Sequence, residues 1–296
     1  MRTVLAIALV ASAAAAQPLK EAIRARIGDF PGTVSLYAKN LDTGATIGIR
    51  ETDPVLTAST IKLAIMAAVF DAVARGQAKW TDPLTVTAAE KVSGSGVIGT
   101  EISNGVQLPL RDVVHLMIVL SDNTATNMIL ERFGADMVNA YLDRIGIKTT
   151  RSLRKIRGDG SDLKAPAGWS AAGRLPENQK YGIGVSTPRD MVALLERAER
   201  GELVSAGASH EMIAVLKRCQ DLTGVRRHLM NMPVAHKTGA LDRLRSESAI
   251  VYSPGGRIAM SITVKGIPEI DWSPDNPGCL MIADLAKILV DGLAKR

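Results

Sequence analysis

Three short strings in this chain of 296 residues carry side chains that could cleave an amide bond: Ser59-Thr60-Ile61-Lys62, Ser121-Asp122-Asn123 and Lys237-Thr238-Gly239. A serine hydroxyl is a poor nucleophile at neutral pH and needs a base nearby. Ser-x-x-Lys alone is a weak signal, because it occurs by chance in many sequences. All three strings, in this order and in suitable structural contexts, strongly indicate nucleophilic catalysis by a serine.

The first string places its serine at the start of a predicted helix. Ser59 begins the apolar, Ala-rich segment 59–75, so Lys62 lies on the same face one turn later. A helix N-terminus directs unpaired N–H groups at whatever Ser59 attacks. Lys62 could be the base if burial and a second cation, for which Lys237 is the candidate, lower its pKa. The alternative is a capping serine and a solvated lysine. It is disfavoured because residues 63–69 are apolar all round and predict a buried helix.

The second and third strings fall where predicted elements meet. Ser121-Asp122-Asn123 ends one helical pattern and begins another, so capping is the simpler role and is expected in part. In the chemical interpretation, Ser121 relays a proton to a leaving nitrogen and Asn123 donates its amide to the substrate. The third string follows Val234-Ala235 and is typical of a strand edge, whose backbone could bind a ligand. A loop before a turn at Gly239 is the alternative.

The three strings together resemble those of the serine β-lactamase and penicillin-binding protein superfamily, and within it class A and its relatives. The resemblance covers essentially all of residues 17–296. It implies an α/β lobe and an all-α lobe with the active site between them, and acylation of Ser59 by a cyclic or peptide amide. It also implies an oxyanion hole formed by the backbone N–H groups of Ser59 and Ala240. Lys237, Thr238 and the adjoining Gly239 would form the substrate-binding strand, with Lys237 and Thr238 holding the substrate carboxylate.

The sequence departs from the class A pattern in the segment that should carry the hydrolytic glutamate. The pattern Glu-x-x-Leu-Asn is absent from residues 146–186. Glu177, followed by Asn178, is the only glutamate there and is the candidate for the catalytic base of deacylation. An exposed carboxylate is the alternative. Counting from the second string would instead place Arg157 near the expected position.

A second departure concerns the arginine that meets the substrate carboxylate. Ser246 stands where many members of the superfamily carry it. Some relatives supply this guanidinium from the preceding helix, and Arg226 occupies the matching position. Arg245 is the competitor, but in this register its side chain would alternate to the opposite face of the strand.

Strand patterns occur at both ends of the chain and helical patterns lie between them. Alternating residues predict a hairpin over Thr33–Ala38 and Thr46–Arg50, and strands over Ser248–Ser253 and Ile258–Val264. We therefore expect an α/β (α+β) fold of the β-lactamase/transpeptidase-like type, with an antiparallel sheet built from both termini and flanked by helices, plus an all-α lobe. Segment 146–186 has no apolar period and is expected to be a long functional loop.

The predicted division gives an α/β lobe of about 17–56 and 225–296 and a helical lobe of about 57–224. Helical patterns occupy one stretch near each terminus and several between. Apart from 59–75, they are Leu19–Ile27, Leu110–Leu120, Thr124–Phe133, Asp136–Ile145, Pro188–Arg200, Ser209–Cys219, Val225–Met230 and Leu280–Ala294.

Residues 1–16 have the composition of a secretory signal peptide. Arg2 precedes the apolar run Val4–Val10, and Ala14-Ala15-Ala16 offers a small-residue cleavage site. A membrane anchor is disfavoured, because the run is shorter than the roughly 20 residues needed to span a bilayer. We expect an exported protein, periplasmic or secreted, without stable membrane insertion.

Composition disfavours several other classes of protein. The formal net charge is +6 and aromatic residues make up only 3%, so a nucleic-acid stacking surface is not expected. The histidines and cysteines have no metal-ligand spacing, and no metal or cofactor is expected. Cys219 and Cys279 could pair in an oxidising compartment, but two buried thiols fit equally well. We expect a monomer.

Three hypotheses follow for the function. The leading one is a class A-like β-lactamase, acylated at Ser59 and then hydrolysed, with a small-molecule β-lactam as substrate. A penicillin-binding DD-peptidase, or a related amidase or esterase, would share the acylation residues, take a peptidoglycan-peptide-like substrate and deacylate β-lactams slowly. A non-catalytic binding module is disfavoured, because every side chain of the three strings is present.

Overall fold

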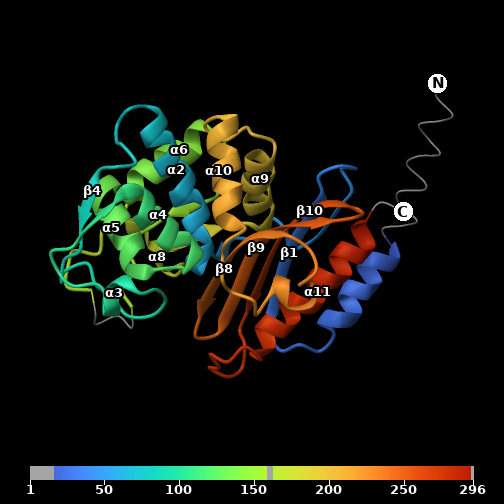
Figure 1. The fold of residues 1–296 in the computed structure, drawn as a ribbon. Helices are drawn as coiled ribbons and strands as arrows, with labels where there is room; N and C mark the ends of the chain where they lie inside the picture. Colours follow the sequence, from blue (N-terminus) through green and yellow to red (C-terminus); the bar gives the residue numbers. More distant parts are fainter. Residues whose placement is uncertain (1–16, 159–162, 295–296) are drawn as a thin grey trace.

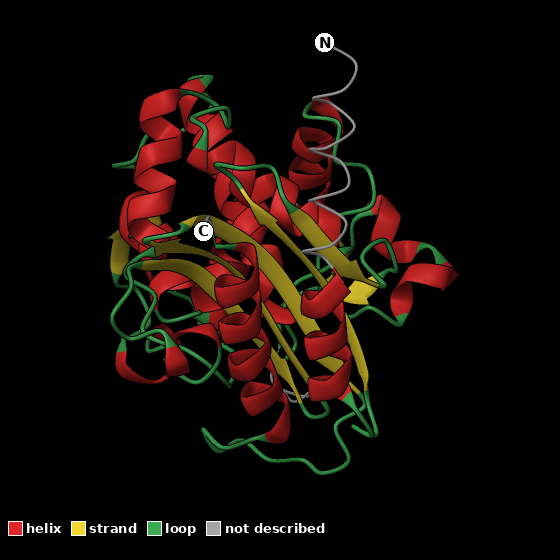
Figure 2. Ribbon diagram, turned by 90° about the vertical axis from the view of Figure 1, so that its right-hand side faces the viewer, coloured by secondary structure: helices red, strands yellow, loops and turns green. Residues whose placement is uncertain are grey.

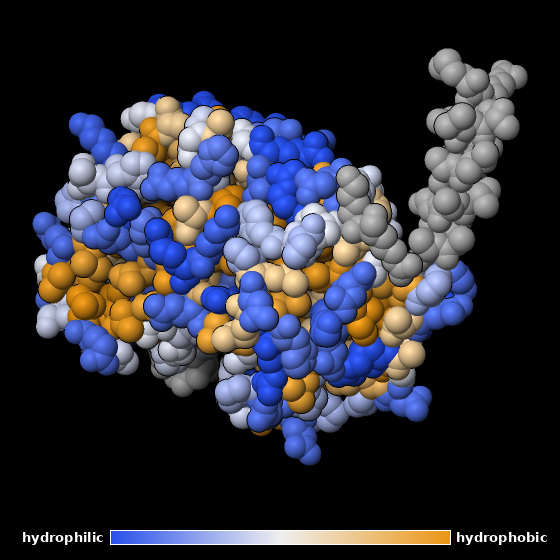
Figure 3. Space-filling model, turned by 45° about the vertical axis from the view of Figure 1, so that its right-hand side comes forward, coloured by the Kyte–Doolittle hydropathy of each residue, from blue (hydrophilic) through white to orange (hydrophobic). Residues whose placement is uncertain are grey.

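The computed structural model of this protein describes residues 17–158 and 163–294. The predicted signal peptide, residues 1–16, lies outside these described ranges. Figure 1 shows a sheet backed by helices at one end of the molecule and a group of helices at the other. On the face drawn in Figure 3, hydrophilic residues cover most of the surface and hydrophobic residues form smaller patches.

The main sheet contains strands from both ends of the chain, as the sequence predicts. It is antiparallel with the order β2-β1-β10-β9-β8, so β8 is an edge strand. The five strands are β1 (Thr33–Asn40), β2 (Thr46–Ile49), β8 (Val234–Leu241), β9 (Leu244–Ser253) and β10 (Gly256–Lys265).

Strand β9 begins four residues before the predicted run 248–253. Its first half carries buried hydroxyl groups that hide the apolar pattern. Ser246 Oγ lies 2.9 Å from Thr263 Oγ1, and Ser248 Oγ donates to Ser261 Oγ at 3.0 Å. Buried polar groups are tolerated where they are paired in this way, so β9 continues although its sequence does not alternate between apolar and polar residues.

The two faces of the sheet belong to two separate cores. On one face, helix α11 (Pro277–Leu293) and the helix at 17–27 pack over residues such as Val251 and Met260. Figures 1 and 2 show these two helices next to each other on the sheet. A Cβ on Gly292 would lie 2.4 Å from Leu19, so this glycine permits their close approach. The other face packs against the group of helices.

Helix α2 (Lys62–Ala74) runs through the middle of that second core. Its first nine residues are buried, which agrees with the apolar pattern seen in the sequence. The prediction of one helix over 59–75 is wrong at its start: a 3₁₀ helix, η1 (Ala58–Ile61), precedes α2 and holds Ser59. Around α2 lie helices α4 (Leu110–Val119), α5 (Asn123–Phe133), α6 (Ala135–Arg144), α9 (Pro188–Glu199) and α10 (Ala206–Leu216).

Two further expectations need correction. Segment 146–186 is not a structureless loop, because it contains short strands and helices. Each of these has too few residues to show a periodic pattern in the sequence. Residues 225–230 form only a short 3₁₀ helix, η2 (Val225–His228). The remaining short elements are β3 (Val55–Leu56), β4 (Pro83–Thr85), α3 (Ile98–Glu101), β5 (Gln107–Pro109), β6 (Arg151–Ser152), α7 (Ala171–Arg174), α8 (Pro176–Gln179) and β7 (Gly184–Ser186), with β7 pairing to both β3 and β6.

Within the described ranges, no helix combines the length and the apolar character that a membrane crossing requires. Cys219 and Cys279 are both buried free thiols, so the unpaired alternative is the one that the structure shows.

Candidate active site

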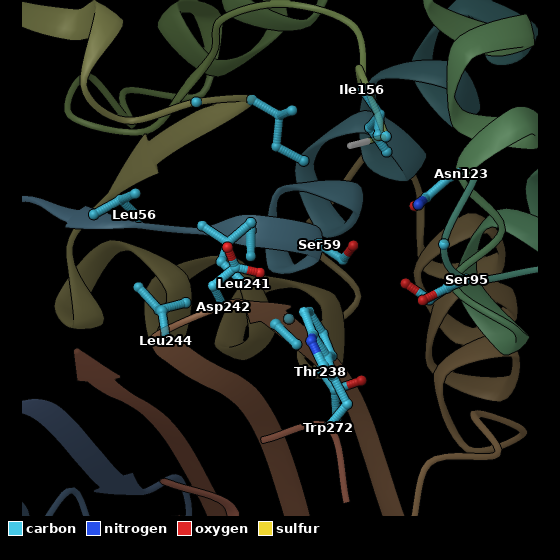
Figure 4. Close-up of a pocket in the computed structure, with 18 of the residues that line it drawn as sticks. Leu56, Ser59, Ser95, Asn123, Ile156, Thr238, Leu241, Asp242, Leu244 and Trp272 are labelled. Carbon is cyan, nitrogen blue, oxygen red and sulfur yellow. The ribbon is translucent and has the colours of Figure 1, made fainter. Parts of the chain in front are cut away.

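A cleft of about 1090 Å³ opens where edge strand β8 meets the helices. Residues from all three strings line it, namely Ser59, Ser121, Asn123, Thr238 and Gly239, and so does the following residue, Ala240. Figure 4 shows Ser59 between Asn123 on one side and Thr238 on another. Positions that are more than 60 residues apart in the chain therefore meet at one surface, as the sequence predicts.

The turn that carries Ser59 is held in an unusual backbone conformation by β8. Ala58 has φ 45°, a left-handed value that is uncommon for a residue with a side chain. Strand β8 can lie against this turn only because residue 239 is glycine: a Cβ there would come within 2.7 Å of Thr57 O and 2.9 Å of Ser59 N. Gly239 is thus part of the strand, and the alternative of a turn at this position is wrong.

Lys62 joins the first string to the second. Its side chain is fully buried, and Nζ donates to Ser121 O (2.7 Å), Ser121 Oγ (3.2 Å) and Asn123 Oδ1 (3.1 Å). Burial, and after it the charge of Lys237, holds the pKa of Lys62 well below its usual value, with Asp122 opposing the shift. The lowered pKa favours the neutral form of the Lys62 amine, which a general base requires.

In the second string, the capping role falls to Asp122. Its buried carboxylate accepts from the N–H groups of Ala125 at 2.8 Å, Val97 at 2.7 Å and Ile98 at 2.8 Å. This caps α5 and ties the loop before α3 to the site. Ser121, at φ 54°, directs its polar groups toward Lys62 instead. The capping expected of this string is therefore confirmed on Asp122, while the chemical roles of Ser121 and Asn123 stay predictions.

The third string buries its lysine behind the cleft wall. Lys237 is fully buried, its Nζ donates to Thr238 O at 2.9 Å, and burial lowers its pKa. Asp221, which the sequence did not single out, also lines the cleft. Burial alone would raise the pKa of Asp221, but hydrogen bonds from Thr223 and Thr238 hold it below its usual value. The Asp221 carboxylate therefore orients the Thr238 hydroxyl by accepting its hydrogen bond.

A buried pair beneath this strand was also missed by sequence reasoning. His236 Nδ1 lies 2.6 Å from Glu247 Oε1, and Glu247 Oε2 accepts from Val225 N at 2.8 Å. Burial by itself lowers the pKa of His236, but contacts with Cys219 and Glu247 raise it to about 10. The two residues lie diagonally across β8 and β9, where same-face neighbours are within reach. Alternation along the two strands was the only signal in the sequence for this pair. It could be used only if the register between β8 and β9 was known.

Neither of the two arginine candidates lines the cleft. Arg245 is almost fully buried, and its guanidinium donates to Leu241 O (2.7 Å), Leu244 O (2.8 Å) and Asp271 O. It does not line the cleft, in keeping with the expected register. Arg226 lies in η2 and likewise does not contribute to the cleft lining. Its buried Nε has no hydrogen-bond partner among the described residues.

Glu177 is not brought to the cleft. It lies on α8, whose residues are all at least partly exposed, and it is absent from the cleft lining. The neighbouring Asn178 donates to Ala172 O at 3.0 Å. Pro176 starts α8 as a separate turn on the surface, while Arg154 and Arg157 from the same segment do line the cleft. Of the cleft-lining residues that are described, none is a glutamate.

Comparison with known proteins defines the class of protein to which this chain belongs. The chain has the fold and the motifs of the serine β-lactamase and penicillin-binding protein superfamily, which confirms the resemblance seen in its sequence. Within it, the chain belongs to the Beta-lactamase enzyme family, whose model matches residues 18–293.

Individual relatives are similar along most of their length. The chain is 26% identical to β-lactamase AST-1 of Nocardia asteroides over 273 residues, which cover 88% of this chain and 79% of that protein. The crystal structure of a β-lactamase from Sphaerobacter thermophilus matches with a TM-score of 0.78 at 26% identity, covering 93% of this chain and 96% of the other. The structure of PBP-A matches with the same TM-score and identity, covering 93% and 95%.

Proposed function

We propose that this protein is a class A-like serine β-lactamase that opens the β-lactam amide by acylating Ser59. The observation that carries the proposal is the environment of Lys62. Its amine is buried, has a strongly lowered pKa and bridges Ser121 and Asn123 at the wall of the cleft that Ser59 lines. A base in this state is what an unactivated serine needs.

The proposed acylation step moves one proton in a cycle. Neutral Lys62 accepts the proton of the Ser59 hydroxyl as Oγ bonds to the carbonyl carbon of the amide. The oxyanion that forms is stabilised by the backbone N–H groups of Ser59 and Ala240. The C–N bond then breaks, and the proton returns from Lys62 through the Ser121 hydroxyl to the leaving nitrogen. The product is an ester on Ser59 and a free amine.

Substrate binding is assigned to the β8 side of the cleft. The Thr238 hydroxyl and Asn123 lie at the surface of the cleft, while His236, whose pKa is raised to about 10, places positive charge behind it beside the buried Lys237. Positive charge in a partly desolvated site favours a carboxylate-bearing substrate. Arg226, whose buried Nε is unpaired within the described structure, lies outside the cleft lining, so it would reach that carboxylate only after a change of side-chain position.

Hydrolysis of the ester is proposed to be the slow step. An acyl-enzyme is hydrolysed when a base holds a water beside the ester carbon. The described cleft offers Arg154 and Arg157 in the segment where the sequence led us to expect that base. A mutant of PBP-A, 25% identical to this chain, has been solved as an acyl-enzyme complex with penicillin G. The presence of arginines where that base was expected also favours a second candidate, a penicillin-binding peptidase or amidase whose natural substrate is a peptide amide.

The proposal is tested by nitrocefin turnover combined with intact mass spectrometry. A burst followed by steady turnover supports a β-lactamase limited by deacylation. A stoichiometric burst with a lasting adduct supports the second candidate. Ser59→Ala should show neither turnover nor adduct, whereas the matched control Ser95→Ala, also in the cleft, should still be acylated. An adduct on the Ser59→Ala protein, or none on the wild type, would contradict the assignment of the nucleophile.

We also propose that the protein is exported, because residues 1–16 have the composition of a signal peptide. We further propose that it is a monomer. N-terminal sequencing of the protein recovered outside the cytoplasm should begin near residue 17. Recovery with an intact Met1 would contradict this part.

A further inference from the structure

Large apolar side chains are exposed at the mouth of the cleft. Leu241, Ile270 and Trp272 are 41%, 57% and 62% exposed, and all three line the cleft that holds Ser59. The other exposed large hydrophobic residues of the described structure lie outside it. Apolar groups gathered at one concave site are typical of a ligand-binding surface, because covering them removes apolar area from water.

The indole of Trp272 is supported from one side by a fixed cation. The guanidinium carbon of Arg245 lies 4.8 Å from the centre of the Trp272 ring. Arg245 is itself held by the carbonyl groups of Leu241, Leu244 and Asp271. One face of the ring is thus occupied by the cation–π contact, while most of the side chain remains open to the cleft.

The loop that carries Trp272 is tied down independently of that contact. Asp271 O accepts from Asn276 Nδ2 at 2.7 Å, and Asp271 Oδ1 accepts from Ser273 N at 2.7 Å. Arg227 Nη1 donates to Pro274 O at 2.9 Å. A surface ordered before binding loses little conformational entropy when a ligand covers it, so the exposed ring is suited to binding and not only to packing within the protein.

The position of the ring relative to the catalytic residues identifies its occupant. Trp272, Thr238 and Ser59 line one cleft, and in the view of Figure 4 Trp272 lies below Ser59. Leu241 follows Ala240 directly on β8. A molecule whose amide lies at Ser59 can therefore reach these side chains only with a substituent attached to its amide-bearing core.

We propose that Leu241, Ile270 and Trp272 form a subsite for a flat, apolar substituent of the substrate, an aromatic ring above all, stacked on the open face of Trp272. This inference rests on the proposed function, since it takes the amide-cleaving site to be the one at Ser59. It assigns Trp272 as the residue that sets a preference, among the proposed substrates, for those with an aromatic side group.

Binding is measured in the Ser59→Ala protein, so that its outcome does not depend on catalysis. The probes are benzylpenicillin, which carries a phenyl group, and 6-aminopenicillanic acid, which lacks it. A second pair consists of two cephalosporins that differ only in an aromatic group on the ring side. We expect tighter binding of the aromatic member in at least one pair, by about tenfold, the size of one aromatic contact.

Variants of Trp272 then locate that preference. Trp272→Ala should abolish it, and Trp272→Phe should retain most of it. The matched control Met230→Ala removes an equally exposed side chain, 59% exposed and outside the cleft, and should leave the preference unchanged. An unchanged preference in Trp272→Ala would overturn the subsite. So would equal weakening of both members of a pair, which would indicate a structural role only. Failure of the proposed function would instead appear as loss of acylation in the wild type, whatever these affinities are.

Discussion

At the scale of single residues, the chemistry depends on the charge state of Lys62. An exposed lysine would be protonated at neutral pH and could not accept a proton from Ser59. Burial, and then the charge of Lys237, lowers the pKa of Lys62. Lys237 therefore has two proposed effects, one on the substrate carboxylate and one on the base.

The first prediction concerns Lys237→Ala. The acylation rate should fall by on the order of 10², the size expected for the loss of a preorganised electrostatic contact. Because the charge of Lys237 lowers the pKa of Lys62, its removal should raise that pKa and move the acid limb of the acylation rate to higher pH. Rapid-quench mass spectrometry across pH measures both effects. Lys265→Ala, an exposed lysine on the same cleft, is the control. An unshifted acid limb would show that Lys237 does not act on the base.

The second prediction concerns Glu177. Because this residue lies on the surface outside the cleft, Glu177→Gln should acylate and deacylate at wild-type rates. Time-resolved intact mass spectrometry with a penicillin follows both steps. A trapped adduct specific to Glu177→Gln would restore the role that the sequence suggested for it.

At the scale of elements, the site depends on how closely β8 approaches η1. Residue 239 lies within the strand, and any side chain there meets backbone atoms of the turn that carries the nucleophile. Backbone atoms cannot rotate away as the end of a flexible side chain can. The close approach fixes the relative position of Ser59 and the backbone of Ala240.

The third prediction is that Gly239→Ala displaces β8 from η1 and lowers the acylation rate by on the order of 10², the cost of misplacing a reacting group by about 1 Å. Gly207→Ala is a matched control, because a Cβ there meets nothing within 4 Å and the residue lies in helix α10. It should stabilise the protein by about 0.5–1 kcal/mol and leave the rate unchanged. Wild-type acylation by Gly239→Ala would contradict the proposed contact.

At the scale of the whole molecule, the pair His236–Glu247 connects three elements: the edge strand β8, its neighbour β9, and η2. The pair lies between the two cores. Glu247 also excludes any side chain at Gly224, where a Cβ would lie 2.0 Å from its carboxylate. This pair should therefore influence global stability as well as the site.

The fourth prediction concerns pH and stability. The folded-state pKa of His236 is raised to about 10, above its usual value of 6.5. Its contribution is thus fully present below about pH 6.5 and is lost as the pH rises toward 10. Urea denaturation should show this loss as the difference between the wild type and Glu247→Gln, because the lowered pKa values of Lys62 and Lys237 act in the opposite sense over the same pH range. Glu247→Gln should remove this pH dependence and cost about 3–5 kcal/mol at low pH, as breaking a buried pair does.

The control for this prediction is Asp284→Asn. It breaks partly exposed pairs with Arg26 and His228, and it should cost no more than about 1 kcal/mol. If Glu247→Gln and Asp284→Asn were equally mild, or if the difference between the wild type and Glu247→Gln did not change between pH 6.5 and 10, the buried charge pair would not exist in solution.

The sequence by itself determined the features that are encoded locally. The three strings, the apolar all-round pattern of α2 and the strands at both ends of the chain depend on neighbouring residues, and the structure agrees with them. Sequence patterns failed where elements were short, as in segment 146–186, or where buried hydroxyl groups broke the alternation at the start of β9. A pattern needs several residues to be visible, whereas a backbone pair needs only two.

Only the tertiary structure decided how residues distant in the chain act on one another. It placed Arg157 in the cleft and Glu177 on the surface, although both belong to one segment. It buried His236 against Glu247 and supported Trp272 on Arg245. The physical reason is the same in each case. Burial, charge interaction and close approach depend on which atoms are neighbours in space, and the spacing along the chain fixes this only within a single helix or strand.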